Sequence, residues 1–119
     1  MNIHTERMDF LSQLLNAATM RHDVIAQNIA NVNTPGFQTL AVSFEEMLQQ
    51  ASGTTAEPSA SSIPPQIVPG TGGIERSDGN NVDVDQEVAR LQKNTLLFKV
   101  YTQVLATEIA QMRSAISGR

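Results

Sequence analysis

The sequence has no cysteine and no tryptophan, a single tyrosine, and only 4% aromatic residues in a chain of 119. Without cysteine, the chain has no disulfides, no thiolate metal ligands and no cysteine nucleophile. The length fits one domain, and the scarcity of aromatic side chains argues against a large core. Length and composition together predict a single domain with a small core.

Positive charge is also scarce, with 8 Lys and Arg against 12 Asp and Glu. The basic residues are spread along the chain without a cationic cluster, so neither nucleic acid nor an anionic membrane surface is an expected partner. No apolar run approaches the roughly 20 residues that cross a bilayer. The first ten residues contain Glu6, Arg7 and Asp9 where a secretory signal needs an apolar segment. We expect no cleaved signal peptide, so that any site outside the cytoplasm is reached by another route.

Residues that could carry catalysis or bind a metal are few. His4 and His22 are the only histidines, and neither has a second ligand at metal-binding spacing. The stretch DGNNVDVDQE fails as a calcium loop, because Asp83 stands at the glycine position and Ala89 at the closing glutamate position. A hydrolytic triad lacks a convincing base, and no phosphate-binding glycine pattern occurs. We expect no catalytic residue, metal site, cofactor or small-molecule substrate.

Two segments show the periodicity of amphipathic helices. The first predicts a helix from about Met8 to Asn31, which ends before Pro35 because proline lacks a backbone donor. Its packing stripe, in steps of four and three, consists of Leu11, Leu15, Ala18, His22, Ile25, Ile29 and Val32. The second predicts a longer helix from about Val84 to Ile116, with coiled-coil spacing and with Gly118 as a stop. Its packing stripe consists of Val84, Val88, Leu91, Thr95, Phe98, Thr102, Leu105, Ile109, Met112 and Ile116.

The segment between these helices differs in composition. Residues 51–73 are rich in Pro, Gly and Ser with one charged residue, which predicts a flexible or disordered stretch. Before it, residues 40–48 form a short amphipathic piece, for which a helix and an extended arm both stay open. We predict a mainly α fold in which two long terminal helices pair as a coiled-coil-like hairpin. Residues 1–50 and 78–119 form one domain, joined by a flexible linker at 51–77.

The longer helix has more apolar surface than one neighbour can cover. Leu97, Tyr101 and Val104 form an apolar row beside its main stripe. Contiguous exposed apolar surface of this kind marks a partner interface. We expect copies of this chain, or close relatives, to cover it in a bundle between subunits.

The segment QNIANVNTPGF, residues 27–37, follows the first helix. Its asparagine amides can bond the free carbonyl groups of a helix end, and Pro35 with Gly36 makes a tight bend. By physical chemistry alone, this is a well-formed helix stop. It also resembles the N-terminal signature of the axial proteins of the bacterial flagellum, the rod and hook family, in which a helix runs into an ANxxTPGY or ANxxTPGF turn. The residues of this expected assembly turn are Asn28, Ala30, Asn31, Asn33, Thr34, Pro35, Gly36 and Phe37.

Two later stretches extend the resemblance. SFEEML at residues 43–48 and DGNNVDVDQEVARLQKN at residues 78–94 are similar to the proximal rod members of that family. Phe37 replaces the commoner Tyr, and residues 38–40 are uncharged where charged residues are usual. The resemblance covers residues 8–48 and 78–117 and leaves out the middle segment.

The resemblance implies a structural subunit of the flagellar rod in the periplasmic space, stacked helically with its own copies and with adjacent rod proteins. Further implied partners are the inner-membrane ring, the ring-to-rod adaptor protein and the flagellar type III export apparatus, which passes unfolded chains without a cleaved signal. A candidate Phe-x-x-x-aliphatic export pattern runs from Phe10 to Leu14, and a second match runs from Phe44 to Leu48. Two alternatives stay open: another axial rod protein of the same family, and a cytoplasmic helical adaptor or chaperone that offers its apolar stripe to a partner helix.

Overall fold

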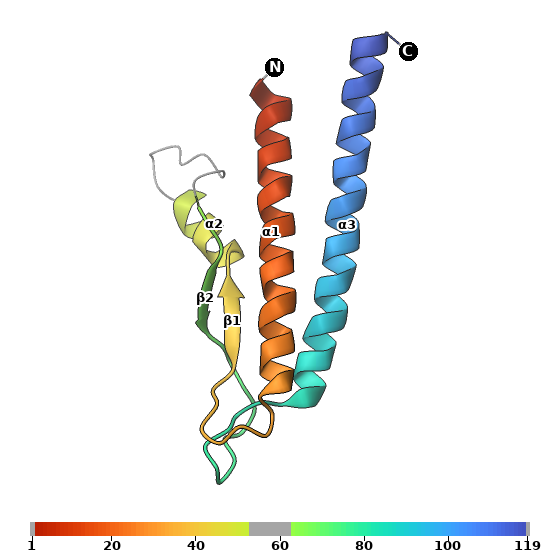
Figure 1. Cartoon of the computed structure of the whole chain (residues 1–119). Coiled ribbons are helices and arrows are strands. Elements are labelled where there is room, and N and C mark those ends of the chain that lie inside the picture. The colour runs from red at the N-terminus through yellow and green to blue at the C-terminus, as the bar shows by residue number, and fades with distance from the viewer. Residues whose placement is uncertain (1, 53–62, 119) are drawn as a thin grey trace.

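Two long helices run side by side over most of the molecule, which measures 64 × 34 × 14 Å (Figure 1). This computed structural model describes residues 2–52 and 63–118. In chain order the elements are α1 (Asn2–Ala30), β1 (Leu40–Ser43), α2 (Glu45–Ser52), β2 (Gln66–Pro69) and α3 (Val84–Ser117). Both termini lie at one end of the helix pair, and the turns that connect the elements gather at the other end. The predicted pairing of two terminal helices in a mainly α fold is confirmed.

The ends of α3 follow from its flanking residues. Asp83 is the N-cap: its carboxylate accepts hydrogen bonds from the backbone N–H groups of Asp85 and Gln86. Gly118 is the C-cap, with the left-handed φ of 68° that glycine adopts at little cost. The predicted bounds of this helix were therefore accurate, whereas α1 begins six residues before the predicted start at Met8.

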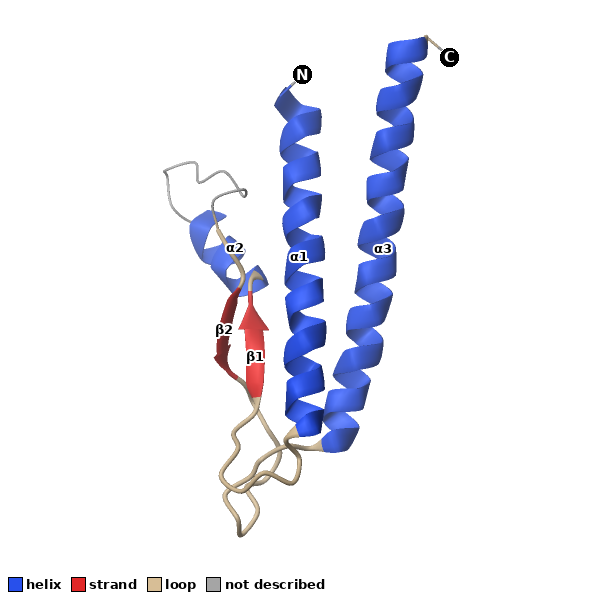
Figure 2. Cartoon of the chain, in the orientation of Figure 1, coloured by secondary structure: helices blue, strands red, loops and turns tan. Residues whose placement is uncertain are grey.

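The middle of the chain contains a two-stranded antiparallel sheet, which the sequence analysis did not predict. Strands β1 and β2 lie side by side (Figure 2). Leu40 pairs with Pro69, and Ser43 pairs with Gln66. Of the flexible linker expected over residues 51–77, residues 53–62 lie outside the described residues, and the described remainder contains β2. Its strand partner is about 26 residues away in the chain, so local composition carries no sign of the pairing. For residues 40–48, the structure resolves the open choice as a strand followed by the helix α2.

The apolar core is small and is formed by α1, β1, the residue that follows β1 and the segment that leads into α3. Phe44, the residue between β1 and α2, is completely buried. The buried apolar residues are Leu11, Ala17, Ala18, Val24, Ile25, Val42, Phe44 and Val82. As composition predicted, one aromatic side chain and a few aliphatic ones make up this core.

The face of α3 that meets α1 is unexpectedly polar. Glu87, Asn94 and Glu108 are buried and stand at intervals of seven and fourteen residues, so they share one face of the helix. Each of the first two contacts α1 by a hydrogen bond: Glu87 accepts from Asn28, and Asn94 donates to the carbonyl of Ala18 at 2.8 Å. Glu108 forms an ion pair with Arg7 of α1 at 2.5 Å.

These buried polar residues lie one position before Val88, Thr95 and Ile109 of the predicted packing stripe. Within one chain, α3 is therefore rotated so that part of that stripe stays at the surface. Val88, Phe98, Ile109 and Ile116 are exposed, while Leu91, Leu105 and Met112 are half-buried. Periodicity identified the apolar residues of α3 but not the side of the helix that contacts α1. That side is set by polar groups of α1, which bond the residues next to the apolar stripe.

Replacement of the central aromatic side chain should test where the core lies. We expect Phe44→Ala to lower the free energy of unfolding by about 3–5 kcal/mol, because it leaves a cavity at a completely buried position. Phe98→Ala is the matched control, since Phe98 is 42% exposed on α3. Urea unfolding followed by circular dichroism measures both. Equal losses for the two variants would contradict this description of the core.

Candidate functional site

Two turns from opposite halves of the chain join at the end of the helix pair. We call residues 28–40 and 71–90 together the turn junction. The N–H of Gly36 donates to the carbonyl of Asp78 at 2.8 Å, and the N–H of Asn81 donates to the carbonyl of Phe37 at 3.3 Å. The side chain of Arg76 also donates to the carbonyl of Val32. These bonds connect the end of α1 to the approach to α3 through backbone groups.

Asn80 and Asn81 bond the first turn with their side chains. The Asn80 amide nitrogen donates to the carbonyls of Asn31 and Thr34, both at 2.9 Å, and Asn80 is completely buried. The side-chain oxygen of Asn81 accepts from the N–H of Thr39 at 2.8 Å and from its hydroxyl at 3.1 Å. The two asparagines therefore satisfy backbone groups that a turn leaves free.

Asn28 connects three elements through one side chain. Its oxygen accepts from the N–H of Leu40 at 3.0 Å, and its nitrogen donates to the carbonyl of Leu40 at 2.8 Å. Through these two bonds the Asn28 amide pairs with both backbone groups of Leu40, as a residue of a neighbouring strand would do. The same nitrogen donates to Glu87 Oε2 at 3.1 Å, so α1, β1 and α3 meet at a side chain that is completely buried.

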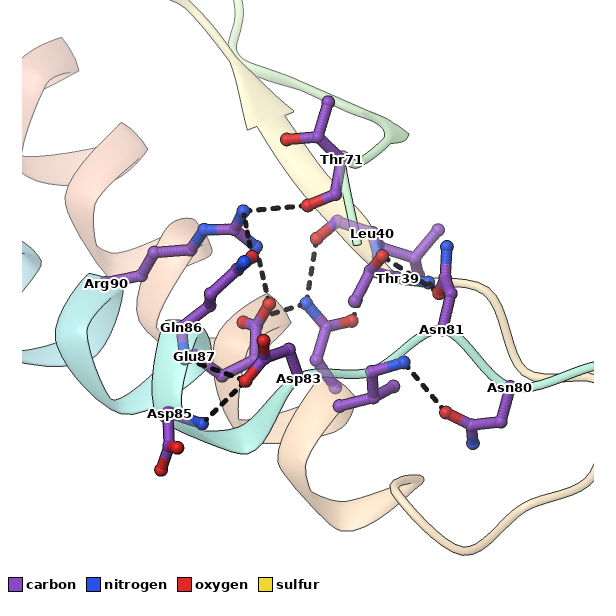
Figure 3. A network of polar contacts seen from close by, with 12 residues as sticks. Thr39, Leu40, Thr71, Asn80, Asn81, Asp83, Asp85, Gln86, Glu87 and Arg90 are labelled. Carbon is purple, nitrogen blue, oxygen red and sulfur yellow. Dashed lines mark hydrogen bonds and ion pairs between the residues drawn. The ribbon is translucent and has the colours of Figure 1, made fainter. Parts of the chain in front are cut away.

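Glu87 extends this network toward the segment before α3 (Figure 3). Its other oxygen, Oε1, pairs with Arg90 Nη1 at 2.6 Å, and Arg90 Nη2 donates to the carbonyl of Thr71 at 2.7 Å. The buried carboxylate thus has a charged partner and an amide donor, which buried charges require. Arg90 thereby connects the segment after β2 to the first turns of α3 by a hydrogen bond.

Glycine is needed where the two turns approach each other. Gly36 and Gly79 have φ values of 74° and 83°, in the left-handed region that favours glycine. A Cβ on Gly79 would stand 3.3 Å from the Cα of Gly36. The close approach of the turns therefore depends on the missing side chain as well as on the backbone conformation.

The residues of the expected assembly turn divide into an inner and an outer group. Asn28 is buried and Asn31 half-buried; the Asn31 amide bonds the carbonyl of Gln27 and the hydroxyl of Thr34, as a helix stop requires. Phe37 is half-buried. The outer group, exposed at the surface, consists of Ala30, Asn33, Thr34, Pro35 and Gly36. Their part in assembly stays a prediction.

Sequence reasoning did not single out three residues of the junction. Asn80, Asn81 and Glu87 entered it only as members of the stretch DGNNVDVDQE, which fails as a calcium loop. The sequence feature that pointed to this region was the DGNNVD stretch, which is part of the resemblance to the rod and hook family. That stretch did not reveal that it pairs with the first turn. A glutamate on the inner face of an amphipathic helix gives no local sign of its partner.

The other predicted residues lie along the helices. Leu11 and Ile25 are buried between α1 and its neighbours, and Leu15 and Ile29 are half-buried. In the export patterns, Phe10 and Leu14 are half-buried, whereas Phe44 belongs to the core and Leu48 is half-buried. His22, expected within the packing stripe, is exposed.

The chemistry of the junction is that of a structural joint. Among the residues that the structure describes, no three His, Asp or Glu side chains come together as metal ligands. None of the described helices has the length and hydropathy needed to span a membrane. A groove of about 420 Å³ beside the junction is bordered by Arg21, Glu45, Glu87 and Arg90, which form ion pairs with each other within the protein.

Paired terminal helices joined through an ANxxTPGF turn define the class of the flagellar rod proteins, and the comparisons agree. Residues 8–38 match the family described as flagella basal body rod protein. The chain is 30% identical to the flagellar basal body rod protein FlgB of Borrelia hermsii, over 89% of this chain and 92% of the relative. It is 30% identical to FlgB of Salmonella typhimurium, over 92% and 91%, and 25% identical to FlgB of Bacillus subtilis, over 99% and 98%. The chain belongs to the FlgB family of flagellar basal body rod proteins, and the predicted resemblance is confirmed.

The central role of Asn28 can be tested by substitution. We expect Asn28→Ala to lower the free energy of unfolding by about 2–4 kcal/mol, because the N–H and carbonyl of Leu40 and the Oε2 atom of Glu87 lose the bonds that Asn28 makes to them. Asn28→Asp should be at least as damaging, since it sets a second carboxylate beside Glu87. Asn33→Ala, at an exposed asparagine, is the control. Urea unfolding of the three variants measures the change in the free energy of unfolding. An unchanged midpoint for Asn28→Ala would refute the central role of Asn28 in the junction.

The approach of the two turns makes a second prediction. Gly79→Ala should lower the free energy of unfolding by about 2 kcal/mol, because it combines a left-handed φ with a contact to Gly36. Gly118→Ala has a similar φ but no atom within 4 Å of the new Cβ, so its effect should be about 1 kcal/mol or less. Thermal unfolding by circular dichroism distinguishes them. The turns are not in close contact if the two losses are equal.

Proposed function

We propose that this rod component is a structural subunit of the proximal rod, that it assembles helically with its own copies and adjacent rod proteins, and that motility requires it. The turn junction makes the two terminal segments one stiff unit, and the sides of the helices then serve as contact surfaces. No step of this role needs a catalytic residue or a cofactor. The subunit transmits torque through the length of its paired helices.

The observation that carries this proposal is the apolar surface that α3 leaves uncovered. Val88, Phe98 and Ile109 are 41%, 42% and 46% exposed, and Ile116 is 86% exposed. Large apolar side chains that follow one side of a helix for over 40 Å are typical of a protein interface. Covering this surface would add to the stability of each subunit on joining the rod.

We further propose that the subunit reaches the periplasmic space through the flagellar type III export apparatus as an unfolded chain. The small core and the polar α1–α3 contact support this, because a protein with little buried apolar area unfolds at modest cost. Export recognition would use Phe10 and Leu14, which lie in one turn of α1. In the rod, the proposed partners are the inner-membrane ring, the ring-to-rod adaptor protein and the next rod protein.

A single charge on the exposed stripe should prevent assembly. In a strain without the wild-type gene, we expect Ile109→Asp to abolish swimming and to reduce the amount of this subunit in purified basal bodies about tenfold or more, because a carboxylate cannot enter an apolar interface. Soft-agar motility and mass spectrometry of basal bodies measure this. Leu105→Asp should also block assembly, but Leu105 is half-buried within the chain, so Ile109 gives the cleaner test.

The control is Ile109→Leu, which keeps the side chain apolar and should swim normally. Circular dichroism of the purified variants establishes that both fold. Normal motility and rod content for a folded Ile109→Asp subunit would contradict the proposed interface. Wild-type protein that is missing from basal bodies and forms a cytoplasmic dimer would contradict the rod role itself.

A further inference from the structure

Three polar side chains lie on the side of α3 that meets α1. Glu87, Asn94 and Glu108 are 1%, 3% and 3% exposed, and their spacing places them along one line of the helix. We call these three residues the polar ladder. Burial of a charge or an amide costs free energy unless a partner compensates it. The ladder therefore stays inside because α1 supplies partners to it.

An apolar face of α3 lies directly beside the polar ladder and is left outside. Val88 follows Glu87 in the chain and is 41% exposed. Ile109 follows Glu108 and is 46% exposed. A step of one residue corresponds to a rotation of about 100° around the helix axis. Burial of apolar area alone would turn α3 by that amount, so that Val88 and Ile109 would contact α1.

The two helices leave open space on the side of this apolar face. Toward the termini, Met8 of α1 and Ile109 of α3 border a hollow of about 400 Å³. Nearer the middle, Ala18 of α1 and Phe98 of α3 border a hollow of about 300 Å³. A turn of α3 would move its apolar side chains into these hollows. The space between the helices thus has room for the turned position.

Beyond the turn junction, two members of the ladder oppose this rotation. The amide of Asn94 donates to the carbonyl of Ala18 at 2.8 Å. Closer to the termini, Arg7 pairs with Glu108 Oε1 at 2.5 Å, and His4 Nδ1 lies 3.6 Å from Glu108 Oε2. A turn of about 100° would break all of these contacts. Because an arginine side chain stays charged, Arg7 is the permanent cation beside the buried carboxylate.

We propose that the polar ladder, through the ion pair of Arg7 with Glu108, sets the rotation of α3 and prevents the chain from burying its own assembly surface. This inference rests on the proposed rod function, which uses the exposed apolar residues of α3. The ladder leaves that apolar area uncovered within one subunit, and the area remains for contacts with neighbours. A buried polar residue selects one alignment of two helices over another in the same way, at a cost in stability.

A substitution at Arg7 tests the proposal. Arg7→Leu removes the cation from Glu108 and adds an apolar side chain to the facing side of α1. We expect the outer half of α3 to turn, so that Ile109 becomes covered. Tyr101, which follows Asn94 by seven residues and is half-buried, should become exposed.

Thiol labelling of the purified subunit measures the rotation. Because the sequence has no cysteine, Ile109→Cys and Tyr101→Cys each introduce a single thiol, whose rate of reaction with iodoacetamide reports its exposure. When Arg7→Leu is added, the rate should fall about tenfold for Ile109→Cys and rise about tenfold for Tyr101→Cys. Arg7→Lys is the matched control, since it keeps the positive charge, and both rates should stay within about twofold of those with Arg7.

Two labelling results would overturn the proposal. Unchanged rates at both thiols in Arg7→Leu would mean that the ion pair does not set the rotation. A rise at both thiols would mean that the helices separate instead of turning. Circular dichroism establishes that each variant folds.

Basal bodies then test the connection to assembly. Arg7→Leu should reduce the amount of this subunit in purified basal bodies about threefold or more, whereas Arg7→Lys should assemble normally. Wild-type content for a subunit with a turned α3 would overturn the role of the ladder in assembly. Absence of the wild-type chain from basal bodies would instead refute the rod function, and the labelling result on the purified subunit would not depend on it.

Discussion

The side-chain amide of Asn28 is the contact on which the rest of the structure depends. It bonds both backbone groups of Leu40 and one carboxylate oxygen of Glu87, and so fixes β1 and α3 against α1 at one point. A carbonyl, a hydroxyl or a carboxylate could supply only part of this pattern, because only an amide offers an acceptor and two donors together. The remaining bonds of the turn junction surround this point and hold the same two halves of the chain.

The two ends of the helix pair differ in how completely their buried polar groups are hydrogen-bonded. At the junction, buried polar groups have partners and the small core lies nearby. Toward the termini, α1 and α3 meet through Asn94 and Glu108, and the side-chain oxygen of Asn94 is buried without a hydrogen-bond partner in the described structure. Such groups reduce stability and favour one alignment of the helices. In the proposed rod, neighbours that cover the helices would add to the stability of this end of the subunit.

The sequence was most informative where structure is local. Helical periodicity predicted both long helices, and Gly118 predicted the end of α3. The Asn31 to Gly36 turn was recognised from its proline, glycine and asparagines. Contacts between distant segments were not predictable, because Asn80 and Glu87 find their partners 46 to 59 residues earlier in the chain. For the same reason β2 was mistaken for linker, and the α1-facing side of α3 was placed one residue away from its position.

Hydrogen exchange of the wild-type protein measures most directly whether the two halves form one unit. Four amides bond groups in the junction: those of Gly36 and Leu40 in the first half, and those of Gly73 and Val82 in the second. If the junction opens as one cooperative unit, all four exchange with the same free energy of opening, above that of amides near the free ends of α1 and α3. Rapid exchange at Gly36 and Leu40 while Gly73 and Val82 stay protected would show that the halves open independently and would contradict this account.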